Sequence, residues 1–121
     1  MARLRLARAA EDDIFDILAW SHARFGEAAR RRYEHLIATA LADIGANPDR
    51  PGSLARPELG VGARTWHLRG SRDRTGEVAG AVQRPRHFLI YRLTEDLVVV
   101  ARVLHDAMEL YRHMTEPDAW D

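Results

Sequence analysis

The sequence predicts an α+β fold, with an N-terminal strand and an antiparallel helix hairpin packed on a mainly antiparallel sheet of about four strands, and a short C-terminal helix. The prediction comes from the spacing of apolar residues. They recur at every second position at the N-terminus, at helical spacing from about residue 10, and at every second position again beyond residue 63. The chain of 121 residues suits a single domain, which we place at residues 1–113, with a C-terminal tail at residues 114–121.

The first strand and the first helix are predicted by a change of period. Residues 3–8 alternate, with Leu4 and Leu6 on one face, as in a half-buried strand. Helical spacing begins near Ala10, where acidic residues fill the first turn and suit the helix dipole, and Phe25-Gly26 interrupts it. The apolar stripe of this helix consists of Ala10, Ile14, Ile17, Leu18 and Ser21.

A second helix follows at once, with an apolar stripe from Tyr33 to Ile44. Gly45 and Pro48 are expected to end it. Because the connection between the two helices is short, they should pack as an antiparallel hairpin that needs a further apolar surface to cover. Residues 47–63 are rich in proline and glycine and are expected to form a crossing loop without regular structure.

The C-terminal half is predicted to supply the sheet. Residues 64–69 and 87–93 alternate as half-buried strands, and a long polar loop is expected between them at residues 70–86. Residues 97–105 are apolar on both faces, which indicates a strand in the middle of a sheet, paired as a hairpin with the strand before it. Helical spacing returns at residues 106–113 with Asp106 as the N-cap.

Composition excludes several classes of chemistry. The chain has no cysteine, so disulfides, thiol nucleophiles and cysteine-bound metals are excluded, and all 18 basic residues are arginine, so a catalytic lysine is excluded as well. Eighteen acidic residues balance them, and the net charge of zero gives no general attraction to nucleic acid. No apolar run approaches the roughly 20 residues that span a bilayer, so we expect a cytoplasmic protein that does not enter membranes.

Several segments resemble the ParE/RelE superfamily of type II toxin–antitoxin toxins, and the ParE branch most closely. The most specific is Arg102 to Leu110 followed by His113, which resembles the terminal signature of that branch. Supporting segments are Ala9 to Ile17 with Phe25-Gly26, the helix exit at Leu41 to Pro48, and Arg86 to Arg92. The resemblance covers roughly residues 4–113.

The resemblance implies a growth-inhibiting toxin that binds DNA gyrase without catalysis, needs no cofactor and forms a hetero-oligomer with a cognate antitoxin. Direct nucleic-acid binding is not expected. The RelE branch implies an alternative, a ribosome-dependent endoribonuclease that cuts messenger RNA. A third alternative is a binding module with the toxin fold and no toxicity.

Candidate site residues differ between these alternatives. An endoribonuclease needs a base, an acid and cations, for which the candidates are His87, Tyr91, Arg92, Arg102 and His105. Because side chains alternate between the two faces along a strand, the two arginines are expected on one face of the sheet and the two histidines and the tyrosine on the other. A catalytic group made of all five would need a bulge, or the ends of the strands, to bring them together. Contacts with gyrase are assigned to Arg92, Arg102, His105 and Met108. A structural alternative pairs Arg102 with a carboxylate of the fold.

Antitoxin contacts are assigned to the N-terminal strand edge and to the helix hairpin, at Leu4, Leu6, Phe15, Trp20, Arg30 and Arg31. Phe15 and Trp20 lie off the apolar stripe, either at the edge of the core or exposed to a partner. The arginines fit a solvated outer helix face equally well. No metal is expected, because the acidic residues at 12, 13 and 16 already suit a helix start, and Glu109 with His113 suits a solvated helix pair.

Overall fold

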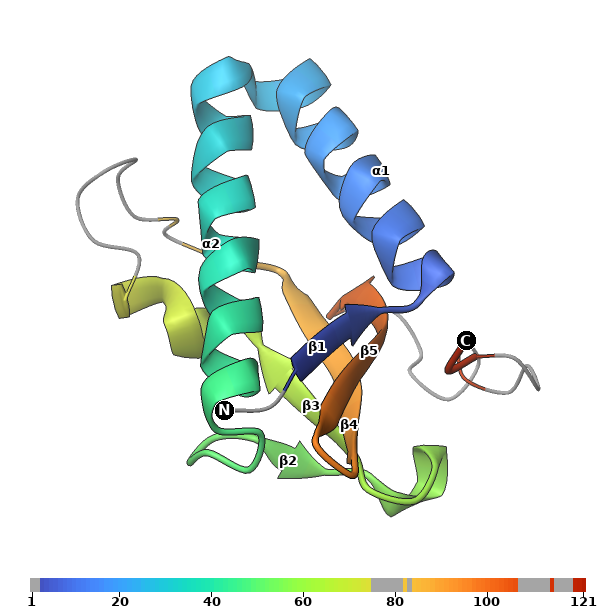
Figure 1. The fold of residues 1–121 in the computed structure, drawn as a ribbon. Helices are drawn as coiled ribbons and strands as arrows, with labels where there is room; N and C mark the ends of the chain where they lie inside the picture. Colours follow the sequence, from blue (N-terminus) through green and yellow to red (C-terminus); the bar gives the residue numbers. More distant parts are fainter. Residues whose placement is uncertain (1–2, 75–81, 83, 107–113, 115–118) are drawn as a thin grey trace.

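The computed structural model describes residues 3–74, 82, 84–106, 114 and 119–121. Within these residues two long helices pack against one face of a twisted five-stranded sheet, as the predicted α+β fold requires (Figure 1). The elements in chain order are β1 (Arg3–Leu6), α1 (Arg8–Phe25), α2 (Glu27–Ala46), β2 (Leu54–Ala55), the 3₁₀ helix η1 (Pro57–Leu59), β3 (Ala63–His67), the 3₁₀ helix η2 (Leu68–Arg74), β4 (His87–Thr94) and β5 (Leu97–His105).

The sheet has the strand order β1-β5-β4-β3-β2. β1 runs parallel to β5, and the other pairs are antiparallel, which confirms a mainly antiparallel sheet. β1 is an edge strand, as predicted, and the doubly apolar β5 lies inside the sheet between β1 and β4. A register shift between Ile90 and Tyr91 leaves Ala101 of β5 as an extra residue.

The helix hairpin turns at Gly26, whose φ of 94° lies in the left-handed region that glycine adopts without strain. The second helix ends where Gly45 and Pro48 predicted, since α2 finishes at Ala46 and its carboxyl end is capped at Asn47. Gly45 lies beside β1, where a Cβ atom would meet Leu4 Cδ1 at an ordinary contact distance of 3.8 Å.

Two expectations need correction. The loop at residues 47–63 contains the two-residue strand β2, which pairs with Arg64 and Thr65, and the 3₁₀ helix η1. The strand predicted at residues 64–69 ends at His67, and the next residues form η2, because the Ser71 hydroxyl is drawn into the core by hydrogen bonds. The helix expected at residues 106–113 falls almost entirely outside the described residues.

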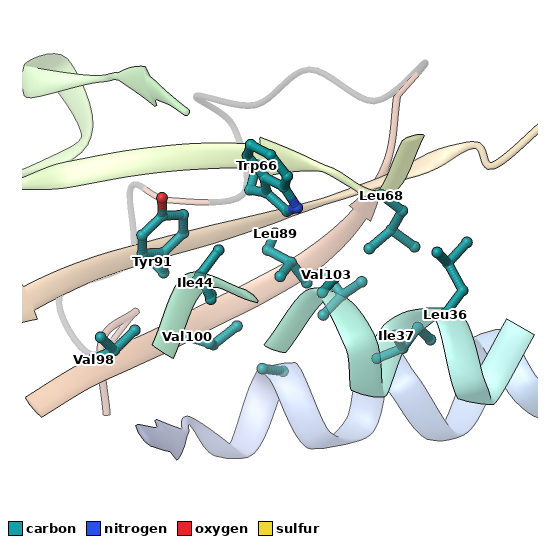
Figure 2. Close-up of a cluster of buried hydrophobic side chains, with 12 residues drawn as sticks. Leu36, Ile37, Ile44, Trp66, Leu68, Leu89, Tyr91, Val98, Val100 and Val103 are labelled. Carbon is teal, nitrogen blue, oxygen red and sulfur yellow. The ribbon is translucent and has the colours of Figure 1, made fainter. Parts of the chain in front are cut away.

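Apolar side chains form one core on each face of the sheet. On the helix face, Trp66 of β3 and Leu89 of β4 meet Leu36 and Ile44 of α2, together with valines of β5 (Figure 2). On the outer face, Ile90 and Leu104 are covered by C-terminal residues, namely Met114, Ala119 and Trp120. β4 and β5 are apolar on both sides because both of their faces are buried.

Candidate functional site

A pocket of about 620 Å³ opens where the helix hairpin projects beyond the sheet. We call it the hairpin pocket. Its described lining residues come from α1, α2, the segment before β4 and the outer ends of β4 and β5: Ile17, Trp20, Ser21, Phe25, Ala29, Arg32, Tyr33, Val82, Arg84, Arg86, His87 and His105. The pocket thus joins the hairpin to residues more than 50 positions away in the chain.

One wall of the hairpin pocket is aromatic and open to solvent. Trp20 is 57% exposed and Phe25 is 63% exposed, and their rings meet edge to face with centroids 5.5 Å apart. The side chains of α1 that face the core end at Ser21, which is buried, so Trp20 lies off that stripe and projects into the pocket. Exposed aromatic rings beside a concavity are typical of a surface that a partner covers.

The same pocket contains a half-buried tyrosine–histidine pair. The Tyr33 hydroxyl lies 2.6 Å from His87 Nδ1 and also accepts a hydrogen bond from the backbone N–H of Arg86 at 3.1 Å. Either group can be the donor in the Tyr33–His87 hydrogen bond, according to which ring nitrogen of His87 carries the proton. Burial raises the pKa of Tyr33 to about 12 and lowers the pKa of His87 to about 4, so both groups are neutral at pH 7.

A second group of polar side chains adjoins this pair and centres on Asp106. His67 Nε2 lies 3.2 Å from one carboxylate oxygen, and His105 Nδ1 and Arg86 Nε lie 3.6 and 3.7 Å from the other. Burial opposes ionisation of Asp106, but the His67 hydrogen bond and the nearby cations lower its pKa overall. The His105 ring in turn lies 5.3 Å from the His87 ring, so the two groups are contiguous.

The charge of the hairpin pocket is positive. Three guanidinium groups line it, those of Arg32, Arg84 and Arg86, and no carboxylate lies among its described lining residues. Among the described carboxylates only Asp106 reaches one of these guanidiniums, that of Arg86, at 3.7 Å. A pocket lined by aromatic rings and by three arginines suits a ligand that carries both an apolar group and a negative charge.

The five residues proposed for an endoribonuclease do not converge. His87 and His105 are adjacent, but Tyr91 is fully buried at the other end of β4, where it bonds Ser53 and the carbonyl of Pro48. Arg92 lies on the outer face with its guanidinium 4.6 Å from the Trp120 ring centre. Arg102 forms a bidentate ion pair with Asp13, which agrees with the structural alternative. The bulge in β5 does not re-aim either arginine toward the histidines.

The residues proposed for antitoxin contacts separate into three places. Trp20 lines the hairpin pocket, and Phe15, which is 72% exposed, lines a second pocket of about 400 Å³ with Arg30. Leu4 and Leu6 are half-buried against the helix-face core, so β1 offers mainly its backbone edge. Arg30 and Arg31 both pair with Glu27, as a solvated helix face would. Met108, proposed for gyrase contacts, lies outside the described residues.

Sequence reasoning missed the role of Tyr33. Its position in the apolar stripe of α2 predicted a core residue, and nothing in the local pattern indicated that its hydroxyl would meet a histidine 54 positions later. Arg84 and Arg86 were likewise read as part of a loop and of a strand start. Only the position of the segment before β4 against the hairpin brings these arginines to the pocket.

In the described part of the chain, no three His, Asp or Glu side chains are grouped so that they could hold a metal ion. None of the described helices combines the length and the apolar character that crossing a bilayer requires.

Comparison with protein families assigns most of the chain to a known family. Residues 4–110 match the family described as ParE toxin of type II toxin-antitoxin system, parDE. No curated protein matches the sequence. The matched span includes both helices and all five strands, and therefore nearly all residues that line the hairpin pocket and the sheet.

Proposed function

We propose that this chain, which belongs to the ParE toxin family of type II toxin–antitoxin systems, inhibits DNA gyrase in the cytoplasm by binding to it, and that a cognate antitoxin neutralises it by covering the helix hairpin. The single observation that carries the antitoxin part is the open aromatic wall of the hairpin pocket. Trp20 and Phe25 are each more than half exposed beside a pocket of about 620 Å³. Covering such a surface with a second polypeptide is favourable, because it removes apolar area from water.

A binding mechanism agrees better with the geometry than catalysis does. Of the two arginines proposed to stabilise charge on a scissile phosphate, Arg102 is held by Asp13, and Arg92 stacks against Trp120 on the far face of the sheet. An inhibitor needs complementarity to its target rather than convergent acid, base and cation. Of the residues assigned to gyrase, Arg92 lies against Trp120 on the outer side of the sheet, and His105 lines the hairpin pocket.

The test is controlled expression of the chain with and without the product of the adjacent reading frame. We expect growth arrest with a DNA-damage response, relieved by the second protein, and purified toxin should block gyrase supercoiling and trap cleavage complexes. Catalytically inactive gyrase serves as the control for nonspecific DNA breakage. Growth arrest with intact supercoiling would contradict gyrase as the target, and absence of any growth defect would favour the non-toxic binding module.

The endoribonuclease alternative has one observation in its favour. His87, His105 and Arg86 lie together at the hairpin pocket, and two adjacent histidines beside a cation can in principle transfer protons at a phosphodiester. If this alternative held, messenger RNA would be cut in a translation extract, and His105→Asn would abolish the cutting. Gyrase activity would then be unaffected by the purified protein.

A further inference from the structure

We infer that the outer face of the sheet, which lies away from the helix hairpin, is the surface that meets the toxin's target, and that the target presents acidic side chains to Arg5 and Arg92 there. The inference rests on the proposed function, because it takes the chain to inhibit gyrase by binding. It goes further in naming the surface and the chemistry of the partner that covers it. Target and antitoxin then occupy opposite sides of the molecule.

The strand pairings place three arginines in one row across the outer face. Val99 of β5 is paired with Arg5 of β1 on one side and with Arg92 of β4 on the other. Arg92 is paired in turn with Ala63 of β3, whose carbonyl accepts the backbone N–H of Arg56 at 2.8 Å. Residues directly opposite each other on neighbouring strands point to the same face of a sheet. Because neighbouring strands lie about 4.8 Å apart, the backbones at Arg5 and Arg92 are separated by roughly 10 Å.

Two of these three charges lack a carboxylate. Arg56 lies 3.6 Å from Glu58, but within the described residues neither Arg5 nor Arg92 forms an ion pair. The Nε atom of Arg92 is buried without a hydrogen-bond partner. A guanidinium that is partly buried without an anion is poorly compensated, and a carboxylate forms stronger hydrogen bonds with it than a neutral acceptor does. The row therefore suits a partner that brings carboxylates to Arg5 and Arg92.

Contacts of the C-terminal residues fix an aromatic ring beside both arginines. The Trp120 ring centre lies 4.6 Å from the Arg92 guanidinium, and Arg5 donates hydrogen bonds of 3.0 Å to the main-chain oxygens of Trp120 and Asp121. At Gly60, a Cβ atom would come within 3.4 Å of the indole nitrogen, so the absence of a side chain gives the ring its place. Tryptophan and arginine are the residues that most often dominate the binding energy of protein interfaces.

The surroundings of the row favour an acidic protein surface over a nucleic acid. Carboxylates interrupt the basic face on both sides, with Glu58 beside Arg56 and Asp96 at 3.3 Å from Arg3. A polyanion gains most from a continuous basic track. Leu54 lies two residues before Arg56, and therefore on the same face of the sheet, and its side chain is 61% exposed. An apolar side chain next to arginines is matched by a protein surface.

The experiment measures the affinity of full-length toxin for purified gyrase by surface plasmon resonance, with inhibition of supercoiling assayed in parallel. We expect Arg5→Glu and Arg92→Glu each to weaken gyrase binding by about ten-fold or more, the effect of losing one charge-assisted contact. Arg24→Glu is the matched control, because it makes the same charge change at an exposed position near the end of α1. It should leave gyrase binding unchanged.

Two further measurements separate a lost contact from a damaged fold. Arg5→Glu and Arg92→Glu should bind the antitoxin as tightly as the wild type does, because the antitoxin covers the hairpin side. Added salt should weaken gyrase binding more steeply for the wild type than for Arg5→Glu, because screening acts on an ion pair that the variant lacks. Arg5→Lys keeps the charge and should retain most of the affinity.

Each other result overturns the inference in a distinguishable way. If both outer-face variants inhibit gyrase as well as the wild type does, the proposed function stands and the surface is wrong. If Arg5→Glu loses antitoxin and gyrase binding together, the outer face is not a separate target surface. If DNA without gyrase binds the toxin with dependence on Arg5 and Arg92, the face recognises nucleic acid. If the wild type neither binds nor inhibits gyrase, the proposed function and this inference both fail.

Discussion

Asp13 of α1 holds Arg102 of β5 through two hydrogen bonds, of 2.7 Å to Nε and 2.9 Å to a terminal nitrogen. The same carboxylate accepts the backbone N–H of Val103 at 2.9 Å. β1 pairs with β5 only as far as Val100. Beyond the end of β1, the Asp13 carboxylate accepts a backbone hydrogen bond from the edge of β5 in place of a neighbouring strand. The pair therefore fastens the first helix to the sheet.

Asp13→Ala should destabilise the protein. Loss of the carboxylate leaves the Arg102 guanidinium and the Val103 N–H without their acceptor in a largely buried place, at a cost of roughly 2–4 kcal/mol in the free energy of unfolding. Urea denaturation measures this free energy. Asp12→Ala is the matched control, because Asp12 is the exposed neighbour on the same helix turn. Equal stability of the two variants would show that the ion pair contributes nothing.

The stability of the fold should fall in mild acid because of His87. Its pKa is lowered from 6.5 to about 4 on folding, so between these values the unfolded chain takes up a proton that the folded chain refuses. Stability is complete above pH 6.5 and declines as the pH falls toward 4, by at most roughly 3 kcal/mol from this group. His87→Asn should flatten that part of the profile of unfolding free energy against pH.

Trp120 should contribute to stability although it is the penultimate residue. Its ring packs beside Gly60 and under the Arg92 guanidinium, and Arg5 donates hydrogen bonds to the carbonyls of Trp120 and Asp121 at 3.0 Å. We expect Trp120→Ala to cost roughly 1–3 kcal/mol in thermal or urea unfolding. Trp20→Ala removes a similar ring from an exposed site and should cost less than about 0.5 kcal/mol. The opposite ranking would mean that the C-terminus does not cover the outer face in solution.

Ser71 should be needed for the packing of Trp66. Its hydroxyl accepts the Trp66 indole N–H at 2.9 Å and donates to the buried carboxylate of Asp43 at 2.6 Å. Ser71→Ala leaves the indole N–H of Trp66 without its acceptor and removes one hydrogen bond from the Asp43 carboxylate, at a cost of roughly 1–3 kcal/mol in unfolding free energy. Thr39→Ala also removes a hydroxyl, but one that bonds a carbonyl of its own helix, and should change stability by less than about 0.5 kcal/mol. A neutral Ser71→Ala would argue against a buried network.

Free toxin should self-associate through the exposed aromatic rings of the hairpin. Phe15, Trp20 and Phe25 are all more than half exposed, and rings of this kind bury about 150–250 Å² each on contact. Light scattering after gel filtration should show oligomers that a triple change to serine shifts toward monomer. Val61→Ser is the control, because Val61 is 92% exposed but lies in a loop away from the hairpin. A wild-type protein that is monomeric at all concentrations would contradict this prediction.

Local sequence patterns were sufficient for the elements that carry long apolar stripes. The α1 stripe predicted from Ala10 to Ser21 is the face that packs on the sheet, and the doubly apolar run at residues 97–105 is an interior strand with the bounds predicted. The same patterns failed at residues 68–74. There, the Ser71 hydroxyl forms hydrogen bonds with Trp66 and with buried Asp43, which lies 28 positions away in the chain.

The sequence by itself determined the fold class, the edge position of the first strand and the family, because periodicity and motif order are local properties of the chain. The tertiary structure decided which polar side chains meet. It paired Tyr33 with His87 and Arg102 with Asp13, and it brought Arg84 and Trp20 to the same pocket. These partners are 54 to 89 positions apart, and where they meet depends on strand order, register and helix docking, which no short stretch of residues specifies.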